Sequence, residues 1–137
     1  MPAAGGEAVQ ITKRGAFRPE ESPDENLLYY GKIGQQGVWS TPVTGGPERQ
    51  VLTSVADQNW TVGSHGIYYL EAPGDPHAPA KVGFYSFRTG TSTAVGTVDR
   101  SAAIDFPGIS LSPDGRWLLY SQATATSSDL MMIENFR

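Results

Sequence analysis

The sequence contains no cysteine, few basic residues and no long apolar run. Without cysteine there is neither a disulfide framework nor thiol chemistry. Ten Lys and Arg, mostly scattered along the chain, stand against fourteen Asp and Glu and give a net charge of −4, so we predict no nucleic-acid partner. No apolar stretch approaches the ~20 residues that span a bilayer, and residues 1–7 do not resemble a secretory signal. The sequence does not fix the cellular compartment of the protein. We expect the cytoplasm by default, and the periplasm if the chain belongs to a longer protein.

Motifs for catalysis, metals and cofactors are also absent from the sequence. His65 and His77 each stand beside Gly or Pro, and neither has a second ligand at metal-binding spacing. There is no Gly-x-Ser-x-Gly elbow and no phosphate-binding glycine-rich loop. The acidic cluster within residues 20–25 lacks the Asp-x-Asp pattern of a calcium loop. We therefore predict no metal site, no cofactor and no catalytic residue.

What the chain does contain is 16 Gly, 10 Pro and a motif that occurs twice. Residues 22–30 and 112–120 each read Ser-Pro-Asp, then two further turn residues, then an unbroken apolar run of four. Proline presets φ for a turn, and an aspartate side chain closes the turn by accepting backbone N–H groups. We predict turn roles for Asp24, Asp114 and Gly115. Gly115 provides a residue that tolerates positive φ, and we expect Asn26 to provide it in the first copy. The apolar runs predict strands buried on both faces. A hairpin in a β-sandwich is the alternative.

A second repeat joins the first dozen residues to residues 41–52. Proline, both glycines and glutamine coincide without a gap between the two stretches. In the later copy Gly45 and Gly46 separate two strand patterns, which is a hairpin signal. The earlier copy therefore predicts an orphan outer strand at residues 8–12, whose sheet partners lie elsewhere.

Counting strand patterns gives four-stranded units of about 40–45 residues, the repeat typical of a β-propeller. We predict one all-β domain over residues 1–137, built of antiparallel blades. After the orphan strand at 8–12, the blades cover 16–53, 57–98 and 103–136, and the last blade lacks its outer strand. Three blades cannot close a ring that needs roughly four to eight. The predicted partner is a second copy, giving a six-bladed homodimer, or else the missing blades of a longer chain.

The two Ser-Pro-Asp copies, together with the closing residues 129–137, resemble the WD40-like repeats of the TolB type, also called PD40 repeats. Such propellers occur in large bacterial proteins, often after a kinase or a winged-helix domain. The resemblance implies a sensor or protein-interaction propeller within a larger regulatory protein. The turn at residues 63–66 departs from the repeat pattern.

Propeller geometry places a ligand site at the mouth of the central channel. The polar residues predicted there are Arg18, Glu20, Asp57, Asn59 and Asp105. The aromatic residues Trp60 and Phe106 would lie nearby, with core packing as the favoured role. We predict a non-catalytic module that binds a protein or a small-molecule ligand. The alternatives are an enzyme acting on a sugar or peptide in the channel, and a structural fragment without activity.

Overall fold

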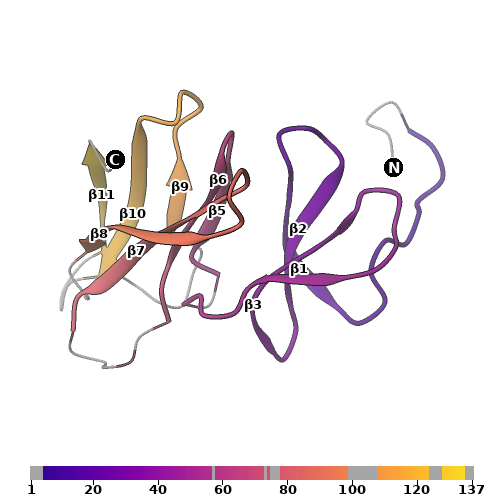
Figure 1. Ribbon diagram of the computed structural model, residues 1–137, viewed down its shortest axis with the longest axis horizontal. Coiled ribbons are helices and arrows are strands. Elements are labelled where there is room, and N and C mark those ends of the chain that lie inside the picture. The colour runs from indigo at the N-terminus through magenta and orange to yellow at the C-terminus, as the bar shows by residue number, and fades with distance from the viewer. Residues whose placement is uncertain are drawn as a thin grey trace.

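The computed structural model describes residues 5–56, 58–72, 74, 78–98, 108–123 and 128–134. Within these ranges the chain forms β-strands and no helix, which confirms the predicted all-β class (Figure 1). In chain order the strands are β1 Ala16–Glu21, β2 Leu27–Lys32, β3 Gln35–Pro42, β4 Arg49–Leu52, β5 Trp60–Gly63, β6 Gly66–Leu70, β7 Ala80–Ser86, β8 Ser92–Val98, β9 Ile109–Leu111, β10 Trp117–Ala123 and β11 Ser128–Glu134.

The strands form three antiparallel sheets, and in each sheet the chain neighbours pair. The first sheet has the order β1-β2-β3-β4, the second β5-β6-β7-β8 and the third β9-β10-β11. β5 lies beside both β1 and β9, so the opening strands of the three sheets meet at one place (Figure 1). The second sheet is thereby placed between the other two.

Two hydrophobic cores join the sheets in sequence. The core between the first and second sheets contains Tyr29, Val38, Leu52, Val55, Trp60, Ile67 and Tyr69. The core between the second and third sheets contains Ala56, Leu70, Val82, Val98, Ile109, Leu118 and Tyr120. Successive residues of β6 thus alternate between the two cores, which explains its unbroken apolar run. Each large side chain buried there contributes about 1.5–3 kcal/mol to stability.

The first Ser-Pro-Asp turn is closed by its own side chains. The hydroxyl of Ser22 donates to Asp24 Oδ1 at 2.5 Å, and the same hydroxyl oxygen accepts the N–H of Leu27 at 2.9 Å. The Asn26 amide donates to Asp24 Oδ2 at 3.0 Å. The hydrogen bonds from the side chains of Asn26 and Ser22 lower the pKa of Asp24.

The second turn repeats most of this network, with Gly115 and Arg116 in place of Glu25 and Asn26. The hydroxyl of Ser112 donates to Asp114 Oδ1 at 2.6 Å, and the N–H of Arg116 donates to the same oxygen at 3.1 Å. These bonds lower the pKa of Asp114. Gly115 has φ of 69°, whereas in the first turn Glu25, with φ of 58°, takes the left-handed position. The expectation that the neighbouring Asn26 fills this position is wrong, because the positive φ falls on Glu25, at the same place in the repeat as Gly115.

Residues 5–12 are not in a strand and pair with no strand of the described chain. Val9 is 70% exposed. The orphan strand expected at residues 8–12 therefore has no strand partner in the part of the chain that the structure describes, and its pairing with a second molecule stays a prediction.

Candidate functional site

Arg18 lies at a bulge in β1, at the place where the three sheets meet. The register of β1 against β2 shifts between Phe17 and Glu20, and Arg18 has φ of 50°. A β-bulge bends the strand and redirects a side chain. Left-handed φ is unfavourable for a residue with a Cβ, so the contacts of the side chain must hold this conformation.

The guanidinium group of Arg18 contacts all three sheets. Nη1 donates to the carbonyl of Gln58, and Nη2 donates to the carbonyl of Ile109 at 3.1 Å. Nε forms an ion pair with Glu20 Oε1 at 3.3 Å. The group also lies over the ring of Trp60, 5.4 Å from its centre. Arg18 therefore ties the first sheet to the opening strands of the other two.

Glu20 makes the neighbouring contact between the first and second sheets. Its Oε2 accepts the backbone N–H of Val62 at 2.7 Å and the hydroxyl of Thr61 at 3.3 Å. Its other oxygen is paired with Arg18, so both carboxylate oxygens are already used within the protein.

Asn59 joins the second sheet to the third. It is buried, its Oδ1 accepts the N–H of Gly108 at 3.0 Å, and its Nδ2 donates to the carbonyl of Ala56 at 3.1 Å. Because a buried amide requires partners, these bonds fix the approach of β9 to β5.

Three of the five predicted channel residues thus come together, and all three are bonded inside the protein. Asp57 and Asp105, with the aromatic Phe106, lie outside the described residues. Trp60 is fully buried in the core between the first and second sheets. The ligand role assigned to the channel residues stays a prediction.

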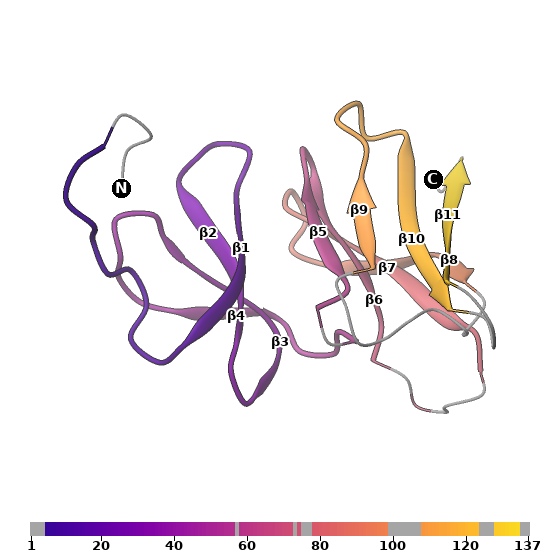
Figure 2. The same cartoon turned by 180° about the vertical axis from the view of Figure 1, so that it is seen from behind.

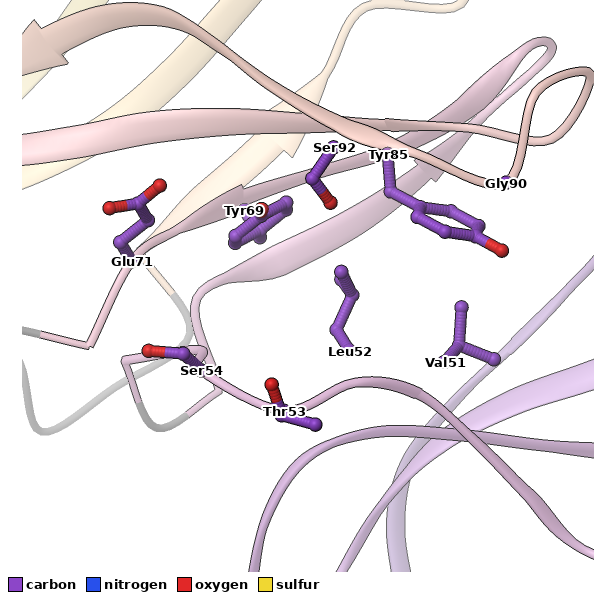
Figure 3. Close-up of a pocket in the computed structure, with 9 residues that line it drawn as sticks. All are labelled: Val51, Leu52, Thr53, Ser54, Tyr69, Glu71, Tyr85, Gly90 and Ser92. Atoms are coloured by element: carbon purple, nitrogen blue, oxygen red, sulfur yellow. The ribbon is translucent and has the colours of Figure 1, made fainter.

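A groove between the first and second sheets carries polar groups that differ from the channel residues in their hydrogen bonding. It has a volume of about 400 Å³ and lies between β4 with its following residues and the strands β6 to β8 (Figure 3). Figure 3 shows Tyr69 and Tyr85 on one side, with Val51 and Leu52 facing them. The lining is completed by Thr53, Ser54, Glu71, Gly90 and Ser92.

The polar groups of this groove are not used by the protein. Within the described part of the chain, the carboxylate of Glu71 and the hydroxyls of Tyr69 and Tyr85 have no hydrogen-bond or ion-pair partner. The ring of Tyr85 is held by an edge contact with Phe87 at 6.4 Å, and Phe87 stacks on Tyr29 at 5.4 Å. Burial, with smaller contributions from Tyr85 and Asp24, raises the pKa of Tyr29 to about 12, so this aromatic support stays uncharged at neutral pH.

Sequence reasoning did not find this groove. Tyr69 stands in an apolar run that predicts a strand buried on both faces, and nothing marks its hydroxyl as accessible. The only local signal was Glu71, a carboxylate directly after a buried strand.

The described residues provide little for other kinds of site. They contain no group of three or more His, Asp or Glu that could hold a metal ion. No helix among them is long and apolar enough to cross a membrane.

Comparison with known proteins gives a match in structure. A solved structure of TolB from Acinetobacter baumannii matches with a TM-score of 0.63 and 15% sequence identity. The match covers 92% of this chain and 32% of the TolB chain. The fold is that of a TolB-like β-propeller. No protein-family model matches the chain, and no curated protein does. This propeller chain therefore spans about a third of the TolB structure, and the likeness concerns the fold.

Proposed function

We propose that this propeller chain is a non-catalytic protein-interaction module whose lateral groove holds an extended peptide segment with a basic side chain. The observation that supports this is the contrast in hydrogen bonding between the predicted channel residues and the groove. Around the meeting point of β1, β5 and β9 the polar side chains are bonded to the protein, whereas in the groove the carboxylate and the tyrosine hydroxyls are available.

The chemistry of the groove favours a peptide as its occupant. Tyrosine offers a large apolar surface and one polar tip, and it is enriched in protein interfaces. Val51 and Leu52 provide an apolar floor, and Glu71 provides one negative charge at the end of the groove. A volume of about 400 Å³ accommodates a few side chains rather than a folded domain. A Lys or Arg side chain that lays its stem along the half-buried Tyr85 can direct its charge toward Glu71.

An enzyme in the central channel has less support. A catalytic carboxylate or base needs free lone pairs or protons directed at a substrate. The side chains of Arg18, Glu20 and Asn59 instead form hydrogen bonds with the backbone of neighbouring sheets. In a larger regulatory protein, occupancy of the groove would provide the sensing that the repeat resemblance implies.

Nuclear magnetic resonance titration with blocked tripeptides tests the proposal. The probes carry Lys, Arg, Leu or Glu between two glycines. We expect saturable amide shifts at Glu71, Gly90 and Ser92 with the Lys and Arg peptides, and weaker or no shifts with the Glu peptide.

Matched charge variants give the control for this titration. Glu71→Gln should weaken the Lys peptide about three- to fivefold, because an accessible ion pair contributes up to about 1 kcal/mol. Glu21→Gln removes the same charge from an exposed position on β1 and should leave the affinity unchanged. Equal effects of the two variants, or shifts confined to other surfaces, would refute the groove as the binding site.

A further inference from the structure

The exposed large apolar side chains of the described chain are concentrated in two segments. β11 carries Leu130, Met131 and Met132, exposed to 79%, 39% and 58%, and the N-terminal segment carries Val9. Ile33, in a turn, is the remaining one. Large apolar groups grouped on a strand edge and on an unpaired segment indicate surfaces that another molecule covers.

The N-terminal segment has the backbone of a hairpin leading into an outer strand. Gly5 and Gly6 have φ of 96° and 140°, and Gly45 and Gly46, in the turn before β4, have φ of 82° and 149°. The sequence repeat places residues 9–12 at the positions of β4, residues 49–52. Both the sequence and the backbone angles therefore assign residues 9–12 the role of a fourth strand.

The segment also lies where the fourth strand of a preceding sheet belongs. Gln10, Ile11, Lys13 and Arg14 line a hollow together with the β3–β4 turn of the first sheet, and the carbonyl of Ile11 lies close to Gly45. This is the side of the first sheet that faces away from the second. β11 lies at the opposite end of the array, so a molecule cannot place this segment on its own β11 (Figure 2).

β11 has an open edge in the described chain. β3 and β7, the third strands of the other two sheets, pair with a fourth strand, whereas β11 pairs with β10 alone. Met132 lies opposite Leu119 on the face turned away from the second sheet. A fourth strand would satisfy the edge and cover these side chains.

We propose that residues Val9–Thr12 of a second copy of this chain add to β11 as its fourth strand, antiparallel, and that two copies close a six-bladed ring in this way. The first sheet provides the register. There Ser40 pairs with Arg49 and Trp39 pairs with Gln50. By the repeats, Met132 then lies opposite Val9 of the second copy and Met131 lies opposite its Gln10.

A second copy fits because the chain carries both halves of the contact. Each copy donates residues 9–12 at one end and accepts a strand on β11 at the other, so the contact is head-to-tail. Such contacts form a closed ring when the last copy meets the first. Two arrays of three sheets give six, within the range of closed propellers. Both open ends are then covered without another protein.

Molar mass by light scattering, with proline variants, tests the strand addition. We expect twice the 14.7 kDa of the single chain. In β3 the backbone of Ser40 faces β4, so by the repeats Met132 pairs with the N–H of Val9. Val9→Pro removes this backbone donor from the added strand and should raise the dimer dissociation constant at least about tenfold. Glu7→Pro is the matched control, because the repeat already has Pro47 at that position; it should leave the dimer unchanged. A mass other than two chains, or equal effects of the two prolines, overturns the proposal.

Cysteine pairs test the register directly, since the natural chain has no cysteine. Val9→Cys with Met132→Cys should form an intermolecular disulfide on oxidation, because residues opposite each other in neighbouring strands meet its geometry. Val9→Cys with Met131→Cys places the second thiol on the other face and should cross-link at least about tenfold more slowly. Equal or reversed rates overturn the assigned register and with it the proposed pairing.

Discussion

The two ends of the array differ in how their outward faces are completed. On the first sheet, Tyr30 and Trp39 face away from the second sheet. The hydroxyl of Tyr30 donates to Glu48 at 2.7 Å, and Lys32 forms an ion pair with Glu48 at 2.5 Å. Lys32 also lies over the ring of Trp39 at 4.0 Å. This end is held by a polar and aromatic cluster of Tyr30, Lys32, Trp39 and Glu48.

The outward face of the third sheet has an apolar character. Leu119 pairs with Met132, and Ser121 pairs with Leu130, on the face opposite the core residue Leu118. No ion pair connects the described side chains of this face. The apolar groups that face water therefore lie mainly at this end, and the polar cluster lies at the other.

This difference indicates the kind of contact that each end can make. Packing two first sheets against each other would bring two charged clusters together, and packing two third sheets would leave the first sheets without a partner. A head-to-tail contact instead places the apolar face of one copy against the outward face of the first sheet in the next, where the half-buried Trp39 lies. The asymmetry of the ends thus agrees with the ring proposed above.

The largest expected effect comes from breaking the polar cluster. Glu48→Ala leaves the buried ammonium of Lys32 unpaired and should lower the free energy of unfolding by about 2 kcal/mol. Met132→Ser, at the other end, should change it by less than about 0.5 kcal/mol, because the side chain is exposed. Urea unfolding measures both, in the Val9→Pro background so that assembly does not contribute.

A second substitution separates charge from packing at the polar end. Lys32→Met added to Glu48→Ala removes the unpaired ammonium and should recover about half of the loss. Equal losses from Glu48→Ala and Met132→Ser would contradict the distinction between the ends.

Acid should affect the first sheet more than the third. The hydrogen bonds from Lys32 and Tyr30 lower the pKa of Glu48, and Asp24 adds a second lowered carboxyl, whereas the third sheet has Asp114. In the folded state these groups release their protons more readily than in the unfolded chain. Their contribution is fully present above the ordinary carboxyl pKa of about 4 and is lost as the pH falls through the lowered values.

The urea midpoint measured between about pH 6.5 and pH 3 checks this expectation. The midpoint should fall with pH, and Glu48→Gln should make the fall smaller than in the natural chain. A midpoint that rises on acidification, or an unchanged slope in Glu48→Gln, would show that these carboxyls do not stabilise the fold.

The sequence was sufficient where structure depends on neighbours along the chain. The Ser-Pro-Asp turns need only residues within a few positions of Asp24 and Asp114, and the apolar run of β6 reports two cores in one short stretch. The sequence also showed that the residues expected nearest the channel, such as Arg18, Glu20 and Asn59, are polar.

The partners of those residues were not visible in the sequence. Arg18 contacts Gln58 and Ile109, whose carbonyls are close only after the three sheets meet. The groove likewise needs Val51 and Tyr85 from different sheets. Such sites depend on distances between sheets, which strand patterns do not contain.

The smallest effect concerns the two matched turns, which place different residues at one backbone position. Glu25 and Gly115 both have positive φ, and no atom lies within 4 Å of a Cβ added at Gly115. Glu25→Gly should therefore stabilise the chain by about 0.5–1 kcal/mol, and Gly115→Glu should destabilise it by a similar amount. Thermal unfolding of the two variants and of their combination measures this. Because space is available at Gly115, backbone conformation alone sets the effect, and the combined variant should return to the natural stability. A loss from both single variants would show that the turns are not equivalent, and that the first sheet has adapted to its glutamate.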